Sequence, residues 1–164
     1  MNEKKYLAVA RYLNCRQNLL KTVKILCEWL PRAVVAAFAA GIIYLALEND
    51  MRIWRFILVP AAAFAAVTVI RKVYKSKRPY EAFNIKPLVK KDKKGESMPS
   101  RHTASAVIIA FAFLYISIPV GIAMLCVSAV IGITRVLCAV HFPRDILVGA
   151  AISCAFAFVG FFVI

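Results

Sequence analysis

The sequence contains few acidic residues, few glycines and no paired-cysteine motif, and each shortage excludes a class of protein. Only 8 residues are Asp or Glu against 22 Lys and Arg, which gives the 164-residue chain a formal net charge of +14. Six glycines and seven prolines are too few for a collagen-like or low-complexity chain. The five cysteines form no CxxC pair and no zinc-type spacing with histidine, so neither a disulfide framework nor a structural zinc site is expected.

Hydrophobic residues, in contrast, are abundant and indicate the class of protein. They make up 62% of the chain, and the mean hydropathy is +0.75. An average globular domain is about 45 to 50% apolar. The charges are crowded into a few stretches, and long blocks carry none. This pattern excludes intrinsic disorder and predicts an integral membrane protein.

Five uncharged or nearly uncharged runs are candidates for membrane-spanning helices. A span needs about 20 apolar residues, with a range of about 17 to 25, so several runs require help from flanking residues. A polar hairpin at residues 48–50 separates the first two runs, and Pro119 and Gly121 mark a tight turn between the third and fourth. We therefore expect an all-α, polytopic helical bundle with about five transmembrane helices. The runs are 33–47, 53–70, 103–118, 120–140 and 146–164.

Residues 1–30 are expected to form a separate N-terminal segment, followed by a transmembrane domain over 31–164. Apolar residues recur at helical spacing between residues 4 and 30, while the other face carries six Lys and Arg. Because these cations make spanning costly, the pattern favours an amphipathic helix in the membrane interface, with its cationic face toward anionic headgroups. The alternative is a solvated helix packed on the end of the bundle.

One long polar segment, residues 71–101, carries eleven Lys or Arg residues. Loops of this length are uncommon unless they have a function. A basic loop can bind nucleic acid, but this one has no interleaved aromatic residues and is held between two apolar spans. Anionic lipid headgroups are therefore the expected partner, and nucleic acid is not. Lys90, Lys91, Lys93 and Lys94 are interpreted as a solvated run.

Three short segments place ionisable residues at the ends of the apolar runs. Ionisable side chains in a membrane cost free energy, so such a set suggests a function. The loop joins the second and third runs, and the fourth run ends on the same side of the membrane, so all three segments can converge at one face. The segments are Arg71 to Pro79, then Pro99-Ser100-Arg101-His102, then Thr134-Arg135 with His141 and Asp145.

These residue types suit phosphoryl transfer. Guanidinium groups bind phosphate oxygens and neutralise the charge of a metaphosphate-like transition state. Ser100, near a helix N-terminus, would add a hydroxyl beside free backbone N–H groups. One imidazole, oriented by a carboxylate, can attack phosphorus while the other protonates the leaving oxygen. His141 and Asp145 are four residues apart, but Pro143 between them favours a turn, so their contact must come from the fold.

The three segments resemble the signature of the PAP2 family, the type 2 phosphatidic acid phosphatases, which reads KxxxxxxRP, PSxH and SRxxxxxHxxxD. Order, spacing and placement against the apolar runs all agree, over about the last hundred residues. Two positions depart from the pattern. Arg71, with Lys72 beside it, stands where the family has lysine, and Thr134 stands where serine is usual. Arg101 fills the variable position of PSxH, where it could touch a second phosphate.

The resemblance implies a fold and a role for each matching residue. The fold would be the helical bundle core that the family shares with vanadium haloperoxidases. His141 would be the nucleophile that forms a phosphohistidine, Asp145 would orient it, and His102 would be the general acid. No metal or cofactor is implied. The phosphate-binding residues would be Arg71 or Lys72, Arg78, Ser100, Arg101 and Arg135.

The implied activity is that of a membrane lipid phosphatase with a phosphorylated lipid as substrate, because a site at bilayer level can receive a headgroup while the tails stay in the membrane. We rank undecaprenyl diphosphate first, and phosphatidate or phosphatidylglycerol phosphate second. The alternative is a noncatalytic scaffold or lipid-binding protein on a PAP2-like frame. The sequence leaves the oligomeric state open.

The charge distribution also bears on orientation in the membrane, which we expect to be the bacterial plasma membrane. Lys and Arg gather on the side that carries the N-terminal segment and the 71–101 loop, while Arg52 and Arg55 stand almost alone on the other side. This excess predicts a cytoplasmic active face. Bacterial lipid phosphatases of this family typically work on the outer face, which would require residues 4–30 to span the membrane. The sequence leaves both orientations open.

Overall fold

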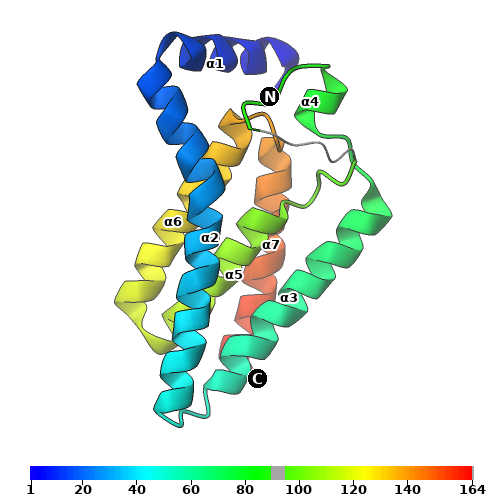
Figure 1. Ribbon diagram of the computed structural model, residues 1–164. Helices are drawn as coiled ribbons and strands as arrows, with labels where there is room; N and C mark the ends of the chain where they lie inside the picture. Colours follow the sequence, from blue (N-terminus) through cyan, green and yellow to red (C-terminus); the bar gives the residue numbers. More distant parts are fainter. Residues whose placement is uncertain (90–94, 164) are drawn as a thin grey trace.

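The computed structural model describes residues 1–89 and 95–163, so the basic run at 90–94 lies outside the described residues. The described chain is a bundle of helices, as the sequence predicts (Figure 1). The elements are α1 (Glu3–Cys15), α2 (Gln17–Leu47), α3 (Ile53–Tyr74), α4 (Pro79–Ala82), α5 (Arg101–Ile116), α6 (Ile118–Leu137), α7 (Pro143–Ala157) and a closing π-helical turn η1 (Phe158–Val163).

Four helical stretches among the described residues are long and apolar enough to cross a membrane: Gln17–Leu47, Ile53–Ala82, Ile118–Leu137 and Pro143–Val163. Their outer faces carry exposed apolar side chains, such as Leu58 at 60% and Leu147 at 69% exposure. The fifth expected span, α5, has only 16 residues and falls below that length. By length, residues 1–89 and 95–163 therefore contain four such stretches rather than the five expected.

The short helix α5 lies in the interior of the bundle. It contacts α2, α3, α6 and α7, and nine of its 16 residues are buried. Its Phe113 packs edge-on against Phe56 of α3 with ring centroids 5.3 Å apart. The tight turn into α6 follows at Ser117, and a methyl group on Gly121 would lie only 2.3 Å from Leu114 Cα. Glycine is thus required where α6 begins against α5.

The N-terminal segment differs from the expected single helix over residues 4–30. Arg16 breaks the helix with φ −122° and ψ 78°, and α2 then continues through Pro31 to Leu47 without a boundary at residue 30. A helix of 31 residues is about 46 Å long, which exceeds a hydrocarbon core of about 30 Å. Cations in the first turns of α2 can therefore lie outside the hydrocarbon core. The free-energy cost of burying these cations then no longer argues against α2 as a membrane-spanning helix.

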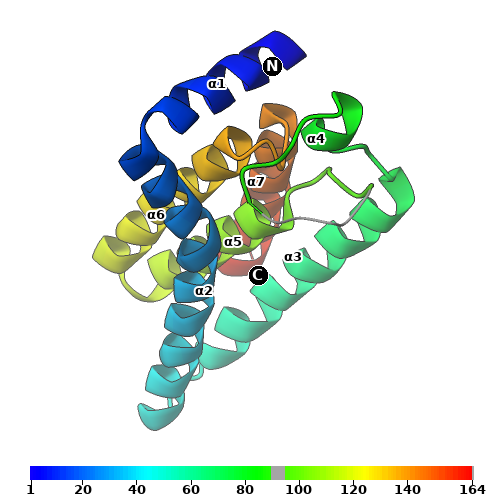
Figure 2. The ribbon, with the colours of Figure 1, turned by 45° about the horizontal axis from the view of Figure 1, so that its top comes forward.

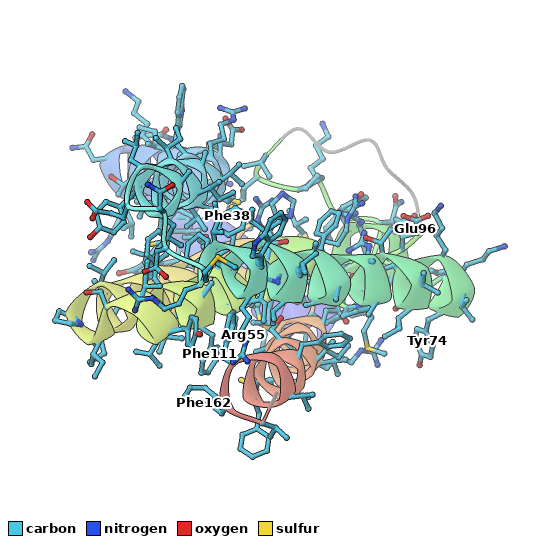
Figure 3. The ribbon with its side chains drawn as sticks, turned by 90° about the horizontal axis from the view of Figure 1, so that it is seen from below. Phe38, Arg55, Tyr74, Glu96, Phe111 and Phe162 are labelled. Carbon is cyan, nitrogen blue, oxygen red and sulfur yellow. The ribbon has the colours of Figure 1, made fainter. Side chains whose placement is uncertain are left out.

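The helix α1 lies across one end of the bundle, where Tyr6 and Leu13 are its buried residues (Figure 2). The start of α2 and Val89 of the long loop share an apolar cluster with Leu13 and with Val140. The N-terminus therefore lies at the same end as the long loop, and residues 4–30 do not cross to the opposite end. Arg55 and Phe162 lie toward the other end of α3, away from Tyr74 and Glu96 (Figure 3).

Candidate active site

The third segment brings its histidine and carboxylate together at a turn. Pro143 begins α7, so His141 precedes the helix while Asp145 lies in its first turn. His141 Nδ1 is 3.6 Å from Asp145 Oδ2, and both side chains are almost fully buried. The backbone N–H of Phe142 donates to the same Oδ2 at 2.9 Å. The contact therefore comes from the turn at Pro143 rather than from one continuous helix.

Ser97 is a member of this group that the sequence analysis missed. Its hydroxyl donates to Asp145 Oδ2 at 2.5 Å and lies 3.4 Å from His141 Nδ1, and the residue is fully buried. Ser97 is itself held by its backbone N–H, which donates to the Ser76 carbonyl at 2.8 Å. No spacing rule points to this residue, because its partner carboxylate is 48 positions away. The only feature of the sequence that could have pointed to Ser97 is its position two residues before the PSxH segment.

The electrostatics of His141 favour a neutral ring. Burial lowers its pKa to about 4, although the hydrogen bond and charge of Asp145 act in the opposite direction. The cations Arg78 and Arg71 also lower the pKa of His141, which places both guanidinium groups in its electrostatic neighbourhood. At neutral pH the imidazole is therefore uncharged. Because Nδ1 faces the serine and the carboxylate, Nε2 is the nitrogen left to act as a nucleophile.

Tyr6 connects α1 directly to the turn that carries His141 and was also missed. Its hydroxyl donates to the His141 carbonyl at 3.1 Å. The ring packs with Phe83 and Phe142 in a cluster whose centroids are 5.9 to 6.0 Å apart. Burial raises the pKa of the Tyr6 phenol, so the hydroxyl keeps its proton and remains a donor. The backbone of the proposed nucleophile is thus held by a residue from the N-terminal helix.

Arg135 is anchored by α2 through the effect of a proline. Pro31 has no N–H, so the Cys27 carbonyl four residues earlier loses its helical partner. An Arg135 Nη donates to this carbonyl at 2.9 Å. The backbone N–H groups of Val140 and His141 donate to the Arg135 carbonyl at 3.1 and 3.3 Å. One residue therefore links α2, the end of α6 and the turn that carries His141.

The structure separates the two candidates for the first motif position. Arg71 is buried, and its Nη donates to the Pro99 carbonyl at 2.8 Å. Lys72 is exposed, because the next residue along a helix points about 100° away. Arg71 is therefore the residue buried at the site, whereas the side chain of Lys72 is exposed, and which of the two binds phosphate stays a prediction. Among the described residues, the Nε atoms of Arg71 and Arg135 are buried without a hydrogen-bond partner.

Arg78 is held by the loop around it. Its Nε donates to the Gly95 carbonyl at 3.3 Å, and its backbone N–H donates to Glu81 at 2.8 Å. The carboxylate of Glu81 also accepts from the Gly95 backbone N–H at 2.8 Å. Glu81 therefore links the Arg78 and Gly95 parts of the long loop through hydrogen bonds to both backbones. The sequence analysis did not single out Glu81.

The PSxH segment forms the start of α5. The Ser100 backbone N–H donates to the Asp145 carbonyl at 2.9 Å, and the hydroxyl is 3.1 Å from that of Thr103. This approach of α7 requires Gly149, since a methyl group there would lie 2.9 Å from the Ser100 carbonyl oxygen. Arg101 and His102 are half-buried in the first turn of α5.

His102 lines a cavity of about 530 Å³ together with Arg135 and residues of α2. The predicted site residues thus lie at one end of the bundle, and among them the side chain of Lys72 is exposed. Within residues 1–89 and 95–163, no three His, Cys, Asp or Glu side chains gather as a metal site would need.

The fold and this site together define a polytopic membrane protein with a buried histidine and carboxylate beside several arginines at one end of a helical bundle. The chain belongs to the PAP2 superfamily, whose sequence model matches residues 52–163. That match contains all three motif segments and leaves out α1 and α2.

Solved structures show the same fold. LpxE of Aquifex aeolicus is 20% identical with a TM-score of 0.67, over 88% of this chain and 93% of that one. The phosphatidylglycerolphosphate phosphatase of Bacillus subtilis, described as the first transmembrane PAP2 type, is 22% identical with a TM-score of 0.50, over 94% of this chain and 90% of that one. The search of curated proteins gave no match.

Proposed function

We propose that this protein is a membrane lipid phosphatase that works through a phosphohistidine on His141. The observation that carries the proposal is the buried, neutral imidazole, whose Nδ1 faces Asp145 and Ser97 while Arg71 and Arg78 lie in its electrostatic neighbourhood. A neutral imidazole has the lone pair that attack requires, and the arginines supply the charge that a phosphate requires. Membership of the PAP2 superfamily supports the same reading.

The first half of the reaction transfers the phosphoryl group to the enzyme. His141 Nε2 attacks phosphorus, the bond from phosphorus to the lipid oxygen breaks, and His102 gives its proton to the departing oxygen. Asp145 stabilises the positive charge that develops on the His141 ring. The arginines bind the equatorial phosphate oxygens, with the unused Nε donors of Arg71 and Arg135 available to them.

The second half regenerates the enzyme. His102, now neutral, accepts a proton from water, the water oxygen attacks phosphorus, and the bond from phosphorus to His141 Nε2 breaks. Inorganic phosphate leaves, and both histidines return to their starting protonation states. The positive charge in this scheme comes from protein side chains, so we propose a reaction without a metal or cofactor.

An apolar groove next to the site supports a lipid substrate. The groove has a volume of about 490 Å³, lies along α5, α6 and α7, and includes Thr103, Pro143 and Leu147 among its lining residues. Thr103 contacts Ser100, and Pro143 follows the His141 turn, so the groove begins beside the site. We propose that it holds the substrate tail. Undecaprenyl diphosphate remains the first choice, with phosphatidate or phosphatidylglycerol phosphate second.

The test is phosphate release by detergent-purified protein, with EDTA present, from these three lipids. We expect release that survives EDTA in the wild type and is lost in His141→Ala, while Lys5→Ala on the exposed face of α1 serves as a control. Release abolished by EDTA contradicts the metal-free reaction, and release unchanged in His141→Ala contradicts the nucleophile. Folded protein that releases phosphate from none of the lipids contradicts a phosphatase and favours a scaffold.

We propose the orientation of the protein in the membrane from the distribution of its Lys and Arg residues alone. The basic end that carries the site would face the cytoplasm, in a bacterial plasma membrane. Cys15 is exposed in α1 at this end, so it reports the orientation. A membrane-impermeant maleimide should label Cys15 in opened membranes and leave it unlabelled in intact cells. Labelling in intact cells would place the site on the outer face.

A further inference from the structure

The cavity that contains His102 and Arg135 is completed by α2, which lies outside the part of the chain that matches the superfamily. Glu28 and Arg32 of α2 line this cavity together with the two site residues. We propose that Arg32 and Glu28 form a leaving-group subsite, which sets the preference between lipid diphosphates and lipid monophosphates. The inference rests on the proposed phosphatase function and specifies its substrate class.

The role of His102 determines which part of the substrate lies in this cavity. A general acid must reach the oxygen that departs, so the leaving group lies on the His102 side of the reacting phosphorus. His102 lines the cavity, and residues 28 and 32 of α2 line it as well. The cavity is therefore the place for the first atoms beyond the bond that breaks, before the tail enters the membrane.

The chemistry of those atoms differs between the two substrate classes. A lipid monophosphate loses a neutral alcohol, whereas a lipid diphosphate loses a lipid phosphate that carries negative charge. A guanidinium on the cavity lining would form a charge-assisted hydrogen bond with the departing phosphate and would have no comparable partner on an alcohol. Arg32 would therefore favour the diphosphate.

Arg32 lines the cavity and also contacts an aromatic residue of its own helix. Its guanidinium carbon lies 4.8 Å from the centre of the Trp29 ring, and this contact restricts an otherwise mobile, exposed side chain. Glu28 lies one helical turn before Arg32 on the same face. Its carboxylate would repel a second phosphate, so the two side chains act on the preference with opposite signs.

The opposite signs make the proposal testable with two substitutions and a matched control. We would measure kcat/KM for farnesyl diphosphate and farnesyl phosphate, which share one tail, and compare the ratio of the two values between variants. Arg32→Gln should lower the diphosphate to monophosphate ratio about tenfold, and Glu28→Gln should raise it about threefold. Arg16→Gln is the control, because Arg16 stacks on Tyr12 at the same 4.8 Å without lining the cavity.

The outcomes are distinguishable. An equal loss on both substrates in Arg32→Gln would show a general role and overturn the subsite, as would an unchanged ratio. A ratio lowered equally by Arg16→Gln would show a long-range charge effect and also overturn it. Failure of the wild type to release phosphate from either substrate, or from the lipids tested above, would instead contradict the phosphatase function and the subsite with it.

Discussion

Replacing Pro31 with alanine tests whether α2 takes part in catalysis by holding Arg135. In the native chain Pro31 has no N–H to donate to the Cys27 carbonyl, and Arg135 donates to that carbonyl at 2.9 Å. Alanine restores an N–H that reaches the same oxygen through the ordinary helical bond. In the variant the backbone N–H of residue 31 therefore competes with the Arg135 guanidinium for the carbonyl, which weakens the contact that holds Arg135.

The expected changes in stability and activity have opposite signs. Proline is about 3 kcal/mol less favourable than alanine inside a helix, so Pro31→Ala should raise the thermal unfolding midpoint. A hydrogen bond to a charged group contributes about 1.5 to 3 kcal/mol, and a carbonyl with two lone pairs can still accept from both donors. Loss of about half of the bond corresponds to about 1 kcal/mol, or about a fivefold fall in kcat/KM.

The assay pairs thermal unfolding in detergent with phosphate release from the best lipid substrate. Pro60→Ala is the matched control, since Pro60 is also a buried proline inside a membrane-spanning helix, α3. That control should leave kcat/KM within about twofold. If Pro31→Ala keeps full activity while its stability rises, then the contact with Cys27 does not position Arg135 and the reasoning is refuted.

Four further results are expected. Tyr6→Phe keeps the ring but removes the donor to the His141 carbonyl, and should lower kcat about tenfold with little change in KM; equal effects on both would contradict a positioning role. Ser97→Ala removes a hydrogen bond to the Asp145 carboxylate and should lower kcat about 10- to 100-fold, whereas Ser97→Thr should restore part of it. Arg71→Ala should lower kcat/KM at least 100-fold and the exposed Lys72→Ala less than twofold; the reverse order would reinstate Lys72. Because His141 must be neutral to attack and its pKa is lowered to about 4, kcat/KM should hold as pH falls below 6 and drop only near pH 4; an acid limb near 6.5 would refute a buried neutral ring.

Much of the fold could be predicted because hydrophobic runs and motif spacing are local properties of the chain. The apolar runs became helices, and the three segments met at one end because the connection between runs fixes their side of the bundle. The sequence could also have shown which of Arg71 and Lys72 faces the interior of the bundle. The buried residues of α3 end with Ala63, Val67 and Arg71, and this spacing of four places Arg71 on the inner face.

The features that the sequence did not predict are of two kinds. Some depend on contacts between residues far apart in the chain, and others depart from a local rule about where helices end. Ser97 and Tyr6 reach the site across 48 and 135 positions, and no periodicity encodes such contacts. The helix α2 continues through Pro31 across the boundary expected near residue 30. Proline normally interrupts a helix, but the Cys27 carbonyl, to which Pro31 cannot donate, accepts from Arg135. The break lies instead at Arg16, between α2 and the helix α1 that lies across the end of the bundle (Figure 2).

The length of α2 has a consequence for the lipid that surrounds the protein. At about 46 Å this helix is longer than the hydrocarbon core, and one continuous rod extends from the hairpin at its far end to the cavity lining near Arg32. A helix longer than the membrane adapts by tilting, and the tilt depends on bilayer thickness. Tilting α2 moves Glu28, Pro31 and Arg32 relative to His102. The activity and selectivity of the reconstituted protein should therefore change with the acyl-chain length of the host lipid, even when the substrate stays the same.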